Sequence, residues 1–228
     1  MFNITFKNQS PANFNAWLGT IPVITPSSTN QTRQNVPALD GDLLVDDASQ
    51  SDAYCDFTIH AKRDDLVAKM RDLRKWLQGT GRLVISNATD AYYEVKRVSF
   101  TQFLFQTEKY GRLSVQMELY PYEFLNSGDL EISSYSTIVN PADVCKPLYK
   151  ITGNGEGTLT INNYAVSFNV AGTLYIDTRR HITSDGSGND ADARINGDYK
   201  KMYLQPGNNS ISCTVGTLKV TPHWGYKI

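Results

Sequence analysis

Alternation of apolar and polar residues recurs along the first half of the chain. Phe2, Ile4 and Phe6 share one side of the opening segment, and residues 112–120 alternate strictly up to Pro121. A period of two places successive side chains on opposite faces of an extended strand. We therefore predict half-buried β-strands at both places, with Pro121 ending the second one. The same pattern predicts further strands over residues 54–60, 82–86 and 92–100.

A polar stretch follows the first strand, and a turn signal stands near its end. The sequence Leu39-Asp40-Gly41-Asp42-Leu43-Leu44 places Asp-Gly between apolar residues. Asp-Gly supplies the positive φ angles of a tight hairpin turn. These residues therefore predict a β-hairpin that turns at Asp40 and Gly41.

The period changes after the strand at residues 54–60. Leu66, Met70, Leu73 and Leu77 follow one another at intervals of three or four residues. Such spacing places apolar side chains along one face of an α-helix. We predict an amphipathic helix over residues 63–78, and no other segment shows a comparable pattern.

The second half contains short apolar segments separated by Gly, Asn and Pro residues. The run Gly-Asn-Gly-Glu-Gly at residues 153–157 predicts a tight turn between strands at 148–152 and 158–161, and residues 183–198 predict a surface loop. Short strands with frequent turns and no helical period are typical of a β-sandwich.

A polar segment with two prolines lies between the two halves, over residues 126–147. Because such a composition is typical of a domain boundary, we divide the chain into domains 1–128 and 129–228. The expected fold class is mainly β. An α+β N-terminal domain with one helix packed on antiparallel sheets precedes a C-terminal β-sandwich.

Charge and cysteine content narrow the classes of function. The 228 residues include 22 Lys and Arg against 23 Asp and Glu, and both halves are close to neutral. Neither half has the cationic surplus that binding to a phosphate backbone or an anionic membrane requires. The three cysteines are far apart, which predicts free thiols rather than disulfides or a zinc site. No signal peptide or membrane span is recognisable, so we expect folding in a cytoplasm and no membrane insertion.

Motifs for catalysis or cofactor binding are not found in the sequence. The three histidines lack metal-binding spacing, and no nucleophile elbow is present. The glycine run at 153–157 leads into a strand rather than a helix, unlike a phosphate-binding loop, and the acidic loop 185–192 lacks the calcium-binding spacing of an EF-hand. No pair of carboxylates is singled out for sugar hydrolysis. We therefore predict no enzyme activity, no cofactor and no catalytic or metal-binding residue.

One short segment is unusual for a monomer. Phe103, Leu104 and Phe105 are consecutive, so a strand through them has apolar side chains on both faces. Such a strand is either central and covered on both sides within the chain, or covered by another subunit. The sequence leaves both alternatives open.

The order of these segments resembles the distal tail proteins of siphophages, which are long-tailed bacteriophages. The resemblance covers nearly the whole chain. In the first half it rests on Trp17-Leu18-Gly19, Leu39-Asp40-Gly41, Lys75-Trp76-Leu77, Tyr92-Tyr93 and Leu119-Tyr120-Pro121-Tyr122. In the second half it rests on Pro147-Leu148-Tyr149-Lys150-Ile151, Gly153-Asn154-Gly155, Tyr175-Ile176-Asp177, Leu204-Gln205-Pro206-Gly207-Asn208-Asn209 and Thr221-Pro222-His223-Trp224.

This resemblance implies a structural role in the virion. N-terminal domains would form a hexameric ring through which DNA passes, and the C-terminal domain would be a galectin-like β-sandwich. The ring would join the tail tube protein to tail-tip, tail-associated or receptor-binding proteins at the baseplate hub. Phe103, Leu104 and Phe105 would then lie at a head-to-tail subunit interface. Near-neutral charge suits a conduit in which DNA is only in transit.

A second hypothesis belongs to a different class of function. The C-terminal β-sandwich could be a carbohydrate-binding module that contacts host cell-surface glycan through aromatic side chains. Tyr175, Tyr203 and Trp224 are the candidate contacts, because sugars stack on aromatic faces. Oligomeric mass and a glycan array distinguish the two hypotheses.

Overall fold

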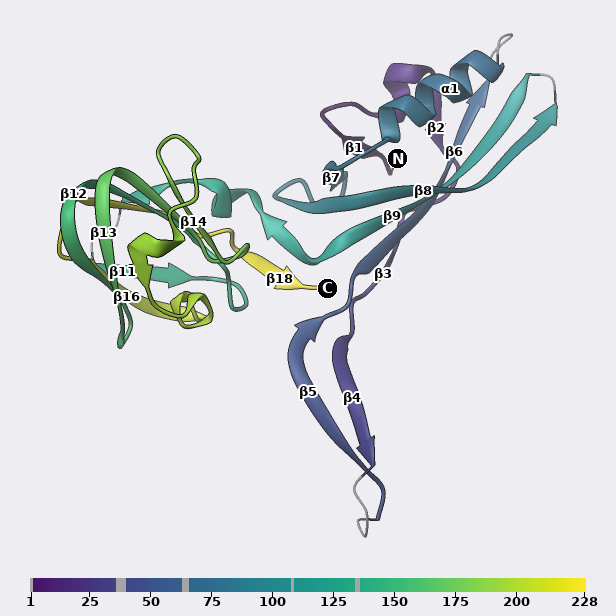
Figure 1. Cartoon of the computed structure of the whole chain (residues 1–228). Coiled ribbons are helices and arrows are strands. Elements are labelled where there is room, and N and C mark those ends of the chain that lie inside the picture. Colours follow the sequence, from purple (N-terminus) through teal and green to yellow (C-terminus); the bar gives the residue numbers. More distant parts are fainter. Residues whose placement is uncertain (1, 36–39, 63–65, 108, 134–135) are drawn as a thin grey trace. The chain divides into compact units, whose positions relative to one another are not determined.

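The computed structural model describes residues 2–35, 40–62, 66–107, 109–133 and 136–228 (Figure 1). About 60% of the chain is in strands, the sheets are antiparallel, and the described residues contain one α-helix. The predicted fold class, mainly β, is confirmed. The chain divides into two compact units: unit 1 is Met1–Glu123 with Lys227–Ile228, and unit 2 is Phe124–Tyr226.

Unit 1 is built on one large antiparallel sheet. Its strands run in the order β1-β7-β8-β9-β6-β2, and β3 also pairs with β6. The predicted alternation is confirmed along β6 and β9, where residues of one face are buried and pair across the ladder, as Phe57 does with Val115. The strands of this sheet are β1 (Ile4–Phe6), β2 (Ala16–Leu18), β3 (Val23–Thr25), β6 (Ala53–Lys62), β7 (Gly81–Ile85), β8 (Ala91–Thr107) and β9 (Tyr110–Leu125).

Helix α1 (Leu66–Leu77) covers part of this core. Leu66, Met70, Leu73 and Leu77 are buried as predicted, while residues 63–65 of the expected helix lie outside the described residues. Gly111 on β9 allows the helix to approach closely, since a Cβ atom at this position would lie 2.5 Å from the Met70 methyl group. The helix is thus fixed to the sheet by the apolar stripe that predicted it.

A separate two-stranded hairpin leaves this sheet between β3 and β6 (Figure 1). We call it the arm; it comprises β4 (Thr29–Asn35) and β5 (Asp42–Gln50). The hairpin prediction is correct, but the turn prediction is wrong. Asn35 pairs with Asp42, so the connection spans residues 36–41 rather than a tight turn at Asp40 and Gly41. Leu39 of the predicted hairpin lies outside the described residues.

Strands β8 and β9 are both longer than the sequence predicted. β9 continues through Pro121 to Leu125, so the expectation that Pro121 ends the strand is wrong. The reason is that β6 ends its pairing opposite Leu119, and Pro121 has no ladder hydrogen bond to donate there. Its carbonyl oxygen accepts a hydrogen bond from the Ile228 amide at 3.3 Å.

Unit 2 is dominated by one long hairpin, β12 (Leu148–Ile161) with β13 (Tyr164–Asp177). Pairing is continuous from Leu148↔Asp177 to Ile161↔Tyr164, so the predicted turn at residues 153–157 is wrong. The glycines there allow a close approach within a strand, because a Cβ atom on Gly157 would lie 2.7 Å from the Phe168 ring. Glycine lowers strand propensity, and the sequence pattern alone therefore favoured a turn.

The bend in this hairpin gives it two sets of neighbours. β12 pairs with β17 through residues 148–152 and with β16 through residues 159–161. Side chains from both parts, such as Tyr149 and Leu159, lie in one apolar core, so a single folded sheet encloses the interior. The other strands of the unit are β10 (Ile132–Ser133), β11 (Ser136–Asn140), β14 (Ile182–Asp185), β15 (Ile195–Asn196), β16 (Gly207–Cys213) and β17 (Thr217–Thr221). The last strand, β18 (Gly225–Lys227), pairs with β9.

Two segments that the sequence predicted to be irregular contain regular structure. Residues 126–147 include β10, paired with β17, and β11, paired with β16. Residues 183–198 include parts of β14 and the short strand β15, and the Asp185 carboxylate accepts hydrogen bonds from the Ser187 and Asn189 amides at 2.9 Å. Both segments are polar because one side of each faces solvent, which is why they resembled loops.

Candidate functional site

Titratable side chains form no metal centre in the part of the chain that the structure describes. No group of three or more His, Cys, Asp or Glu side chains is placed to hold a metal ion there. Burial raises the pKa of the Cys55 and Cys145 thiols to about 12, so both are protonated core residues near neutral pH. Within the same residues, no helix has the length and apolarity to cross a membrane. Two exposed surfaces of unit 1 are candidate functional sites.

The first surface is the far end of the β8–β9 hairpin, which we call the tip (residues 101–112). Phe103, Leu104 and Phe105 are 40%, 41% and 50% exposed, so unit 1 does not cover this strand by itself. The Phe103 and Phe105 rings pack edge to face with centroids 4.5 Å apart, and Leu104 lies on the opposite face. Within unit 1 this strand is therefore not covered on both sides, and coverage by another subunit stays a prediction.

The outer edge of β8 is also open at the tip. β7 pairs with β8 only as far as Val95, and none of the strands described in unit 1 pairs with that edge from Lys96 to Thr107. An open edge presents a row of free N–H and C=O groups that can pair with another strand. On the other side of the hairpin, the Lys62 ammonium on β6 lies 5.2 Å from the centroid of the Tyr110 ring on β9. The tip is therefore an apolar strand with an open edge.

The arm is the second surface. Leu43, Leu44 and Val45 are consecutive on β5, and they are 46%, 56% and 44% exposed. Like the tip, this strand has apolar side chains on both faces over three residues. Sequence reasoning missed this surface because it assigned Leu43 and Leu44 to a turn-flanking hairpin. The signal that could have revealed it is the same triple apolar run that singled out the tip.

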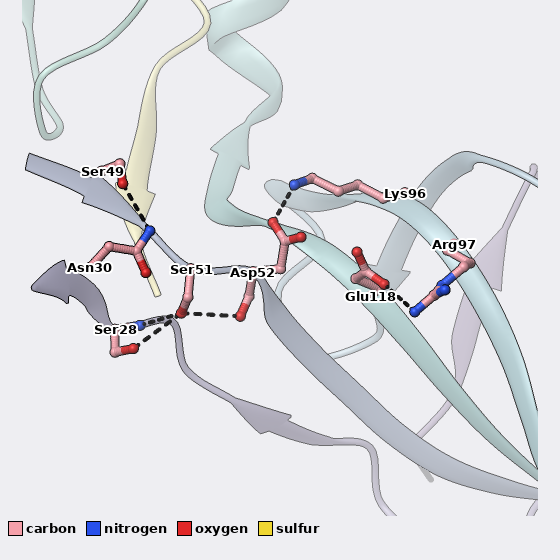
Figure 2. A network of polar contacts seen from close by, with 8 residues as sticks. All are labelled: Ser28, Asn30, Ser49, Ser51, Asp52, Lys96, Arg97 and Glu118. Carbon is pink, nitrogen blue, oxygen red and sulfur yellow. Dashed lines mark hydrogen bonds and ion pairs between the residues drawn. The ribbon is translucent and has the colours of Figure 1, made fainter. Parts of the chain in front are cut away.

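Polar contacts fix the base of the arm to the sheet, as Figure 2 shows. The Ser51 amide donates to the Ser28 carbonyl oxygen at 2.8 Å, and the Ser28 amide donates to the Ser51 hydroxyl at 2.9 Å. Two residue pairs further out, the Asn30 side-chain amide donates to the Ser49 hydroxyl at 2.8 Å. These bonds tie the two strands together where they leave the large sheet.

Two ion pairs continue this network across the sheet (Figure 2). The Lys96 ammonium contacts the Asp52 carboxylate and so joins β8 to the residue that precedes β6. Arg97 pairs with Glu118 on β9 at 2.9 Å. Both pairs are partly exposed, so each adds no more than about 1 kcal/mol, and their main effect is to orient the strands at the arm base.

The aromatic residues proposed for glycan contact differ in their exposure. Trp224 is only 5% exposed and belongs to the core of unit 2, so it has no free face for a sugar and the prediction is wrong for this residue. Its burial follows from the apolar surroundings that also hold β12 and β17. The sequence could not distinguish a buried aromatic near the end of the chain from an exposed one.

Tyr175 and Tyr203 are both partly exposed on unit 2. Tyr175 lines a shallow hollow of ≈ 380 Å³ together with polar groups of Asp177 and Arg180. The Lys150 ammonium lies 5.6 Å from the Tyr175 ring centroid. Tyr203 stands apart from this hollow, and its hydroxyl is 2.8 Å from a ring nitrogen of His181. The structure therefore does not bring the three predicted glycan residues into one site.

Of three comparisons with known proteins, the comparison with solved structures finds a similar fold. No protein-family model matches the chain, and no curated protein matches it. Among solved structures, the chain is similar to the crystal structure of SPP1 Dit, described as a paradigm of the hub adsorption apparatus in phages that infect Gram-positive bacteria. The TM-score is 0.71 at 12% sequence identity, over 96% of this chain and 97% of that one. The predicted resemblance is thus confirmed at the level of structure: from end to end, the chain has the fold of the SPP1 Dit hub protein.

Proposed function

We propose that this chain is a structural virion protein of a long-tailed phage, forming a ring-shaped hub at the distal end of the tail. The observation that supports it most is the extent of the structural similarity. It covers nearly all of both chains, so unit 1 and unit 2 both have counterparts in the Dit structure. A fold alone does not define a function, and the surface properties of unit 1 therefore matter as independent support.

Those surface properties suit an assembly protein. The tip and the arm expose apolar residues that a monomeric protein would normally cover. In this proposal unit 1 forms the ring, a hexamer through which DNA passes, with Phe103, Leu104 and Phe105 at the subunit interface. Unit 2 is the galectin-like β-sandwich. The ring joins the tail tube protein to tail-tip, tail-associated or receptor-binding proteins of the baseplate, and the chain has no catalytic role.

The mass of the protein in solution tests whether six copies form a ring. Size-exclusion chromatography with light scattering, repeated over a dilution series, should give six times the 25.5-kDa chain mass. Negative-stain images of the same fraction should show closed rings with a central opening. A protein that remains monomeric at every concentration, and also when mixed with its tail tube protein, would contradict the proposal.

A glycan-binding role for unit 2 is the second candidate, and the hollow beside Tyr175 is the observation that favours it. An aromatic ring next to the Asp177 and Arg180 side chains offers both stacking and hydrogen bonding to a sugar. A glycan array probed with the whole protein and with Tyr175→Ala tests this role. Binding that Tyr175→Ala abolishes supports it, and an array without any bound glycan contradicts it.

A further inference from the structure

The arm and the tip share an unusual property, which suggests that they contact each other in an assembly. Leu43-Leu44-Val45 on β5 and Phe103-Leu104-Phe105 on β8 are both runs of three exposed apolar residues within a single strand. Consecutive residues of a strand point to opposite faces, so neither run can be covered by packing against one face alone. Edge-to-edge pairing covers both faces, because side chains of paired strands stand beside each other on each side of the sheet.

Both strands have a free edge where the apolar run lies. β5 pairs with β4 alone among the described strands, and it keeps its other edge open. β8 pairs with β9 on one side, and beyond Val95 its other edge has no partner within the described part of unit 1. Pairing β5 with β8 would therefore satisfy two rows of backbone groups as well as two apolar runs.

Charge is complementary between the two elements. Residues 29–50 include four aspartates and one arginine. The tip segment 101–112 includes two cations, Lys109 and Arg112, and one glutamate. The acidic arm therefore repels a second arm, whereas the weakly basic tip attracts it. The pattern favours a contact between unlike surfaces.

The contact cannot form within one chain. The arm base is held at Ser28 and Ser51, just before β6 begins, and the tip lies at the other end of β6, where Lys62 pairs with Tyr110. The ten residues of β6 separate these ends by roughly 30 Å at about 3.3 Å per residue. Figure 1 shows the arm leaving the sheet at the end of β6 away from the tip.

We propose that β5 of one copy pairs with the open edge of β8 in the next copy, so that the arm of each subunit extends the sheet of its neighbour. This inference rests on the proposed ring and names the surfaces that close it. The contact joins two different surfaces of the same chain, and such a heterologous contact propagates around a ring. The partner that the arm binds is thus a second copy of this chain.

Cysteine pairs test this contact in the whole protein. Each variant also contains Cys213→Ser, since Cys213 is the one partly exposed native thiol. A preparation with Leu44→Cys is mixed with another that contains a single cysteine substitution at residue 103, 104 or 105, and a mild oxidant is added. We expect a disulfide-linked dimer only in mixtures of arm and tip variants. Leu44→Cys mixed with Val139→Cys, an exposed control 61% accessible in unit 2, should remain unlinked.

The positions that cross-link distinguish strand pairing from an unspecific apolar contact, because only strand pairing makes linking alternate along the strand. If Leu44→Cys links to Leu104→Cys, Leu43→Cys should not, because its side chain lies on the other face of β5. Links with no such alternation would overturn the pairing. A preparation that is hexameric by light scattering but never links arm to tip would overturn this inference and leave the proposed ring intact. A chain that is monomeric throughout would overturn both.

Discussion

Phe105→Asp is the substitution that tests the ring interface most directly. Phe105 is 50% exposed in unit 1, so half of its side-chain surface is free for a neighbouring subunit. A phenylalanine buries on the order of 200 Å² in all. Covering the remaining half would remove about 100 Å² of apolar surface from water, which stabilises an interface by ~2.5 kcal/mol.

The substitution also places a carboxylate where the partner is apolar. An unpaired charge in an interface adds several kcal/mol to the loss, so each contact should weaken by at least ~4 kcal/mol in total. Since ~1.4 kcal/mol corresponds to a tenfold change in affinity, subunit affinity should fall about a thousandfold. Within the subunit, Phe105→Asp removes the edge-to-face contact with Phe103 and the burial of the covered half of the ring, which together contribute up to ~3 kcal/mol to stability.

Light scattering and circular dichroism together give the outcome. If the wild-type chain forms the proposed hexamer, the variant should be monomeric at the same concentrations, with an unchanged far-ultraviolet spectrum and a thermal midpoint lower by only a few degrees. Leu130→Asp, an equally drastic change at a residue 66% exposed in unit 2, should leave the hexamer intact. A hexameric Phe105→Asp variant would refute the placement of this residue in the interface. An unfolded variant would place it in the intrachain core instead.

Two further predictions concern the interiors of the units. Gly157→Val should destabilise unit 2 by about 1–3 kcal/mol, because its side chain would overlap the Phe168 ring, and a urea titration measures the loss; an unchanged midpoint would contradict the close approach. Because burial raises the pKa of Cys55 and Cys145 to about 12, a thiol reagent at pH 8 should modify Cys213 first and leave the other two unreacted until urea is added. Rapid labelling of all three thiols in native protein would show that the two cores are not closed as described.

The sequence predicted what depends on local periodicity. Alternation along residues 112–120 and the helical spacing from Leu66 to Leu77 both correspond to elements of the structure. In each case one face is buried, so the apolar residues recur with the period of the element. The apolar run from Phe103 to Phe105 stood out because it breaks the alternation of β8, but the sequence did not decide between coverage within the chain and coverage by another subunit.

The errors concern features that depend on distant partners. Residues 153–157 form part of a strand because Gly172 and its neighbours on β13 pair with them across the hairpin. Pro121 continues β9 because β6 has already ended its pairing opposite Leu119. Neither partner is visible in the local composition, where glycine and proline both favour turns. Burial of Trp224 is likewise decided by the fold of unit 2 as a whole.

The contacts at the arm base would affect the angle between neighbouring subunits in such a ring. A head-to-tail contact gives a closed ring when the angle between successive subunits is correct, and an open chain when it is not. If β5 of each subunit pairs with β8 of the next, that angle depends on the direction in which the arm leaves its own sheet. Ser28, Ser51 and the Lys96–Asp52 ion pair hold this direction at the point of departure (Figure 2). These contacts stabilise the subunit only slightly, so their role in assembly would be geometric: they select one subunit angle, and with it the number of subunits in the ring.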